Sequence, residues 1–118
     1  MRLLHSGLPS GPFREDYRRR RRYLPPKYFA MRRCPRVHFK TVILDGERAY
    51  LGSANFTGAG LGMKSAGRRN FELGVVTAAP AAVDQLADYF FWVWDGGACR
   101  SCRQKKYCPR PLAGPLDD

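Results

Sequence analysis

The pattern of apolar and polar positions predicts a chain of short strands joined by turns. Runs rich in β-branched or aromatic residues, with other extended segments, predict strands at 2–5, 28–33, 37–44, 49–52 and 71–77. Asp45-Gly46 is a hairpin signal, so the strands on either side of it should pair antiparallel. Residues 6–12 are rich in glycine and proline, which predicts a turn. The Gly-rich residues 56–69 predict a loop with a short helical turn.

Two further segments have the features of helices. One apolar face at helical spacing predicts a helix over 80–95, and it comprises Val83, Leu86, Ala87, Phe90 and Trp94. Pro80 suits its first position, and Gly96-Gly97 should end it. A second, very basic helix is expected over 13–23, before Pro25-Pro26. Mixed strands and helices place the fold in the α/β class.

Composition narrows the class of protein. The chain has 118 residues, of which 44% are hydrophobic and 26% charged, as in an ordinary globular domain. We expect no transmembrane segment, because no apolar run approaches the 18 or more residues that span a bilayer. The first residues lack the apolar core of a secretory signal, so a cytoplasmic protein is expected.

Positive charge is concentrated at the front of the chain. The formal net charge is +11, and residues 1–36 carry 11 basic and 2 acidic side chains, which leaves +9 there. The excess lies mainly in the run Arg18, Arg19, Arg20, Arg21 and Arg22. Such a patch favours polyanions, either nucleic acid or an anionic membrane surface. A solvated helix face is the plainer interpretation.

A candidate site lies around the predicted hairpin. His38 and Lys40 are two residues apart on a predicted strand and should project from the same face. Ser53 and Asn55 repeat this spacing just after the return strand. Lys40, Ser53 and Asn55 could together hold the oxygens of a phosphate, which leaves His38 as nucleophile or proton carrier.

Glu72, on the later strand, is a candidate partner that would orient the His38 ring. The combination indicates a metal-independent reaction in which one imidazole attacks phosphorus and a second protonates the leaving alcohol. Water then releases the product from a phosphohistidine.

The spacing His38-x-Lys40-x4-Asp45-x6-Gly52-Ser53-x-Asn55 resembles the HKD motif of the phospholipase D superfamily. Residues 69–74 are similar to that family's second conserved strand, and the resemblance covers about 28–95. Residues 33–38, with the Cys-rich tail, resemble a bacterial subgroup of small phospholipase D-like proteins.

The resemblance implies a phospholipase D-like half-domain with a mixed β-sheet flanked by helices. It implies that His38 is the nucleophile or the acid, that Lys40, Ser53 and Asn55 bind phosphate, and that Glu72 orients His38. Asp45 and Gly52 would be structural.

The chain carries one such motif, whereas the two-step reaction needs two histidines. Relatives with a single motif form homodimers with both motifs at the interface, so we expect a twofold dimer. Those relatives have further strands before the motif, so the first strands of the half-domain are expected to be missing here. We divide the chain into a domain over 1–97, with the motif at 38–55, and a Cys- and Pro-rich tail over 98–118.

Three functions remain open. A nuclease is favoured by the charge, with tentative nucleic-acid contacts at Arg18 to Arg22, Lys64, Arg68 and Arg69. A phospholipase or phosphatidyl-transferase would use the same site on phospholipid. The third possibility is an inactive module that only binds nucleic acid.

Four cysteines form a second candidate site. Cys99, Cys102 and Cys108 are close together in the sequence, and Cys34 is the only further thiol. A reducing compartment disfavours disulfides. The four thiols could bind zinc or a [4Fe–4S] cluster in a structural role, or remain free.

Overall fold

The computed structural model describes residues 1–57, 61–63 and 65–117. The chain divides into two compact units, Met1–Val37 together with Trp92–Asp118, and His38–Phe91. The Cys-rich tail belongs to the same unit as the first 37 residues, and the expected boundary between a domain over 1–97 and a separate tail stays a prediction.

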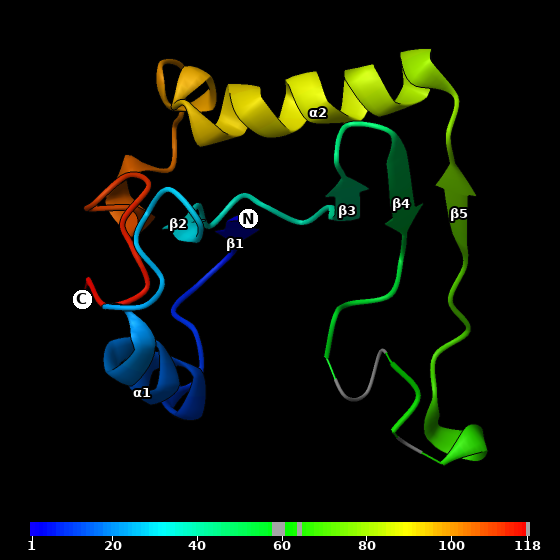
Figure 1. Ribbon diagram of the computed structural model, residues 1–118, viewed down its shortest axis with the longest axis horizontal. Helices are drawn as coiled ribbons and strands as arrows, with labels where there is room; N and C mark the ends of the chain where they lie inside the picture. The colour runs from blue at the N-terminus through cyan, green and yellow to red at the C-terminus, as the bar shows by residue number, and fades with distance from the viewer. Residues whose placement is uncertain (58–60, 64, 118) are drawn as a thin grey trace. The chain divides into compact units, whose positions relative to one another are not determined.

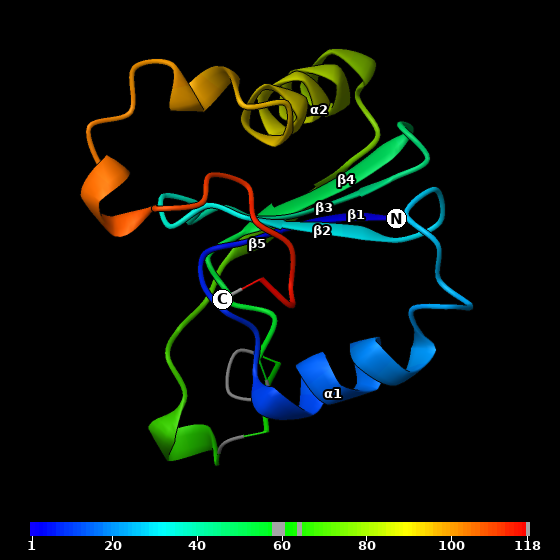
Figure 2. The same ribbon diagram turned by 90° about the vertical axis from the view of Figure 1, so that its left-hand side faces the viewer.

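The first unit contains a two-stranded parallel sheet. β1 (Arg2–His5) pairs with β2 (Ala30–Arg33) so that Leu3 lies opposite Met31, and the two strands run side by side in Figure 2. Leu4 and Met31 are buried. Parallel strands need a crossover connection, and the intervening chain supplies it.

α1 (Gly11–Arg20) lies in that crossover. Ser10 caps the helix, its hydroxyl accepting from the Phe13 amide at 3.4 Å, and Pro12 is in the first turn. These two residues start the helix two positions earlier than predicted, and it ends at Arg20 instead of Tyr23. Its Tyr17 ring packs against Phe29, with ring centroids 5.7 Å apart.

The second unit contains a three-stranded antiparallel sheet in the order β3 (Lys40–Leu44), β4 (Arg48–Gly52) and β5 (Gly74–Thr77), as Figure 1 shows. The predicted hairpin is confirmed. Residues 45–47 join the strands, with Asp45 and Gly46 at positive φ of 54° and 73°, and the Glu47 amide donates to the Leu44 carbonyl at 3.0 Å.

Two predicted strands of this unit are shorter than expected, and in the first unit β2 begins at Ala30 instead of Tyr28. β3 begins at Lys40 instead of Val37, and β5 begins at Gly74 instead of Phe71. Within the described residues both strands pair with β4 alone, whose five residues limit the length of each ladder. His38 therefore precedes the strand on which it was predicted.

α2 (Pro80–Trp94) confirms the predicted amphipathic helix. Val83 and Trp94 are buried, and Leu86, Ala87 and Phe90 are partly buried. Gly96, at φ 82°, donates to the Val93 carbonyl and ends the helix. Three short 3-10 turns follow the longer elements, η1 (Ala66–Arg68), η2 (Gly97–Cys99) and η3 (Lys105–Tyr107).

The described residues thus form an α/β fold with two α-helices and small sheets. The single mixed sheet that we expected is replaced, within these residues, by one parallel and one antiparallel sheet. None of the helices in the described ranges is both long enough and apolar enough to cross a bilayer.

Candidate functional site

The register of the hairpin brings the two halves of the motif together. Lys40 lies opposite Gly52, which is the last pair of the β3–β4 ladder. The chain on either side of this pair, toward His38 and toward Ser53, therefore leaves the sheet at the same end (Figure 1). Segments that are separated by the whole hairpin in sequence meet here because Asp45-Gly46 sets the turn.

His38 and Lys40 are in direct contact. Lys40 Nζ lies 3.0 Å from Nε2 and 3.1 Å from Nδ1 of His38, and it donates to the His38 backbone carbonyl at 2.7 Å. The His38 side chain is exposed and Lys40 is partly buried. An ammonium group beside an accessible imidazole can attract an anion to the ring and balance its charge.

Ser53 is tied to the segment before β5. Its amide donates to the Leu73 carbonyl at 2.9 Å, and its hydroxyl oxygen accepts from the Leu73 amide at 3.1 Å. The hydroxyl donates to Glu72 Oε2 at 2.5 Å. This contact holds the Ser53 side chain in a defined direction and binds it to a carboxylate.

Glu72 was expected to orient His38. The contact that the structure gives it is with the Ser53 hydroxyl, and no hydrogen bond joins Glu72 to His38 within residues 1–57, 61–63 and 65–117. The orienting role stays a prediction.

Tyr50 is a residue of this site that the sequence analysis missed. Gly52 and Gly74 lie opposite each other in the β4–β5 ladder, and the Tyr50 ring lies over both. A β-carbon on Gly74 would stand 2.5 Å from Tyr50 Cε2. The available signal was an aromatic residue two positions before a motif glycine, since residues two apart on a strand share one face and the glycine leaves that face open to the ring.

The remaining predicted site residues are exposed. Asn55 follows the ladder, and its carbonyl accepts from the Thr57 amide at 2.8 Å. Arg68 and Arg69 are exposed at η1. Lys64, a predicted nucleic-acid contact, lies outside the described residues.

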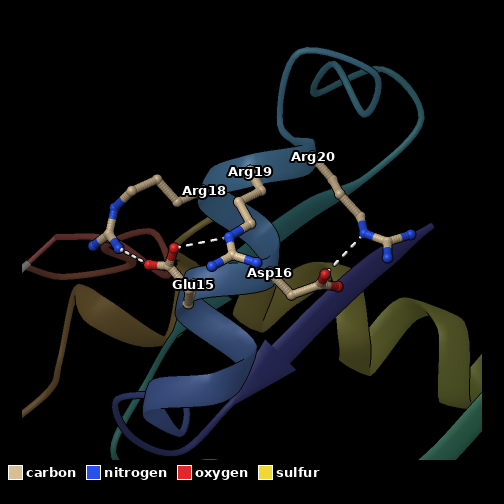
Figure 3. Close-up of polar contacts among 5 residues, drawn as sticks. All are labelled: Glu15, Asp16, Arg18, Arg19 and Arg20. Atoms are coloured by element: carbon tan, nitrogen blue, oxygen red, sulfur yellow. Dashed lines mark hydrogen bonds and ion pairs between the residues drawn. The ribbon is translucent and has the colours of Figure 1, made fainter.

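The arginines of α1 pair with two carboxylates (Figure 3). Arg18 and Arg19 contact Glu15 at 2.6 and 2.9 Å, and Arg20 contacts Asp16 at 2.8 Å. The hydrogen bonds from Arg19 and then from Arg18 lower the pKa of the Glu15 carboxyl. All of these side chains are about half exposed or more. Exposed pairs of this kind are weak and can exchange for phosphate contacts.

The four cysteines all lie in the first unit, and all are free and partly exposed. Burial raises the pKa of the Cys108 thiol, and the charges of Cys34, Cys99 and Cys102 raise it further. The Gln104 amide donates to the Cys102 sulfur and lowers the pKa of that thiol, and the Arg36 side chain lowers it further. In the part of the chain that the structure describes, no three His, Cys, Asp or Glu side chains stand close enough to hold a metal ion.

The structure thus shows a small α/β domain in which His38 and Lys40 are in contact and Ser53 lies just beyond the last pair of the hairpin ladder. A family model described as "Cardiolipin synthase, PLD-like domain" matches residues 6–94, and the chain belongs to this family of the phospholipase D-like phosphodiesterase superfamily. The predicted family is confirmed, over a longer segment than the expected 28–95. Searches of curated proteins and of solved structures gave no match.

Proposed function

We propose that the chain is a metal-independent phosphodiesterase that cleaves nucleic acid through a phosphohistidine at His38. The contact between Lys40 Nζ and both ring nitrogens of His38 carries this proposal. The ammonium group can hold a phosphate oxygen beside the ring, so the nucleophile and the phosphorus atom are brought together.

The reaction has two steps. A ring nitrogen of His38 attacks phosphorus, the bond to the leaving oxygen breaks, and that oxygen takes a proton from His38 of the partner subunit. The partner's His38, now neutral, removes a proton from water. The water oxygen attacks phosphorus and breaks the P–N bond, which regenerates the enzyme.

This scheme needs a second copy of the chain. β5 is an outer strand of its sheet, and the apolar side chains of Phe71, Leu73, Val75 and Val76 in and before it are exposed. An exposed apolar edge of this kind favours association with another chain. We expect an excess of His38→Asn protein to inhibit wild-type protein beyond simple dilution, because mixed dimers would hold one reactive imidazole.

The basic front of the chain supports nucleic acid as the substrate. Residues 14–22 contain six arginines against Glu15 and Asp16, which leaves a charge of +4. The ion pairs of Arg18, Arg19 and Arg20 are with these same two carboxylates. We expect that replacing Arg21 and Arg22 together lowers the slope of log DNA affinity against log salt concentration. The decrease should correspond to the loss of about two phosphate contacts.

Phospholipid is the second candidate substrate, because the description of the matching family names a cardiolipin synthase. The same residues would then transfer a phosphatidyl group through His38. The α1 arginines would meet anionic lipid in that case.

The test uses the full chain with plasmid, single-stranded DNA, RNA and phosphatidylglycerol vesicles, each in EDTA. We expect cleavage of nucleic acid and loss of cleavage in His38→Asn, with unchanged activity in His5→Asn, the other histidine of the chain. Activity on vesicles alone would favour the phospholipid reaction. No turnover of any substrate would overturn the enzymatic proposal.

A further inference from the structure

The Cys-rich tail lies against the end of β2 through its backbone. The Arg33 amide donates to the Ala113 carbonyl at 2.9 Å, and the Arg33 guanidinium donates to the Asp117 carbonyl. Cys34 follows directly, and its own amide donates to the His5 carbonyl at 2.9 Å. A thiol that is about 65 residues from the others in sequence is thereby brought into their unit.

The tail has little else to order it. Beyond α2, the only helical elements among the described residues are the three-residue turns η2 and η3, and of residues 95–117 Pro115 alone is buried. Short segments without their own hydrophobic core are commonly held by disulfides or a structural metal ion. Disulfides are absent at these four cysteines.

The local backbone around the thiols suits metal ligands. Cys99 ends η2, and the Cys102 amide donates to the Cys99 carbonyl at 3.3 Å, which closes the turn of the Cys-x2-Cys pair. The Gln104 amide points at the Cys102 sulfur. Amide donors to sulfur stabilise thiolate ligands and fix their direction.

Positive charge surrounds the thiols as well. The Arg36 side chain donates a hydrogen bond to the Cys102 sulfur, and the Arg33 guanidinium lies within electrostatic reach of the Cys108 sulfur. Arg33 Nε is buried and has no hydrogen-bond partner in the structure. A centre of four thiolates around a divalent ion has a net charge of −2, and these guanidinium groups would offset it.

We propose that Cys34, Cys99, Cys102 and Cys108 bind one zinc ion, which attaches the tail to the end of β2. Among the described residues the sulfurs are not gathered in a group of three, so binding requires them to move closer together. Cys34, Cys99 and Cys102 all lie within electrostatic reach of Cys108. Each thiol that is protonated releases its proton to solvent as it binds, and no electron is transferred.

Zinc fits this set because four thiolates in a closed tetrahedral arrangement are typical of structural zinc sites, and a Cys-x2-Cys pair is a common ligand spacing there. The proposal is independent of the catalytic proposal, since all four cysteines belong to the first unit and His38 belongs to the second.

The full chain is purified without added metal, and its zinc, iron and sulfide contents are measured. We expect one zinc per chain and four thiols protected from alkylation, all four becoming reactive once a chelator removes the metal. Cobalt substituted for zinc should give the intense charge-transfer absorption of a tetrahedral thiolate site.

Variants then test the ligand set. Cys34→Ser should weaken zinc binding by at least about 10- to 100-fold, the loss that even an outer partner of a ligand causes, whereas Ser101→Ala should bind as the wild type does. Mapping the alkylated residues in wild-type protein tests whether Cys34 is a zinc ligand, and it needs no variant that could misfold. Reactive Cys34 in zinc-loaded protein, iron with sulfide in place of zinc, or four reactive thiols without any metal would each overturn the proposal.

Discussion

The Tyr50 ring lies across Gly52, so that a β-carbon at residue 52 would collide with the Tyr50 hydroxyl and stand 3.0 Å from the Leu73 carbonyl. Gly74, opposite Gly52 in the ladder, is covered by the same ring. The motif glycine therefore leaves room for an aromatic side chain on its own strand, next to Ser53.

Gly52→Ala should destabilise the second unit by about 1–3 kcal/mol, because overpacking shifts the ring or the backbone. Urea unfolding measures the loss. Gly67→Ala is the matched control, because nothing lies within 4 Å of a β-carbon there. We expect Tyr50→Ala to recover part of the loss in the double variant. Equal unfolding midpoints for Gly52→Ala and Gly67→Ala would contradict the packing argument.

Lys40→Ala should lower kcat by about 10²–10³-fold, the usual effect of removing one donor that stabilises a developing negative charge. The reason is its contact with the His38 ring, beside which the proposed reaction places the phosphate. Lys27→Ala is the control, because Lys27 lies over the Tyr28 ring in the other unit. Full activity in Lys40→Ala would remove this amine from the reaction.

Glu72→Gln should raise KM more than it lowers kcat. The carboxylate holds the Ser53 hydroxyl, so its loss should loosen a phosphate ligand. Steady-state kinetics across pH, with Glu47→Gln as the control, separates the two possible roles. A large fall in kcat with a displaced pH profile would instead support the orientation of His38 by Glu72.

The Glu15 pairs should make α1 sensitive to acid. Because Arg19 and Arg18 hold the pKa of Glu15 below its ordinary value of 4.5, the carboxylate stabilises the helix above that value. This stabilisation is lost as the pH falls through the lowered pKa. The protection factors of the α1 amides, which correct for the slower intrinsic exchange in acid, should therefore fall as the pH is lowered. In Glu15→Gln they should already be lower at neutral pH and should fall less in acid.

The control for this measurement is Glu47→Gln, which lies in the hairpin of the other unit. Identical exchange profiles in Glu15→Gln and wild type would show that the pairs of Figure 3 contribute nothing to the helix.

The thiols should differ in reactivity once metal is removed. The lowered pKa of Cys102 gives it more thiolate at neutral pH, and the raised pKa of Cys108 gives it less. Brief alkylation followed by mass spectrometry should therefore modify Cys102 first and Cys108 last. Arg36→Gln should slow the reaction of Cys102, whereas Arg103→Gln should leave it unchanged. Equal rates at all four positions would contradict this order.

Much of this protein was predictable from local signals in the sequence. Apolar spacing predicted α2, Asp45-Gly46 predicted the hairpin, and the two-residue spacing of His38 and Lys40 agrees with the contact between their side chains. Each of these depends on residues that are close in the chain, where backbone geometry leaves few alternatives.

Only the tertiary structure decided the long-range pairings. The starts of β3 and β5 depend on the length of β4. The Ser53–Glu72 contact joins residues 19 positions apart. The hydrogen bond from the Arg33 amide to the Ala113 carbonyl attaches the tail to β2. Residues that form hydrogen bonds between distant segments have no periodicity or composition in the sequence that identifies their partners. The sequence therefore determined the local elements and the motif, while packing determined where strands end and which distant groups touch.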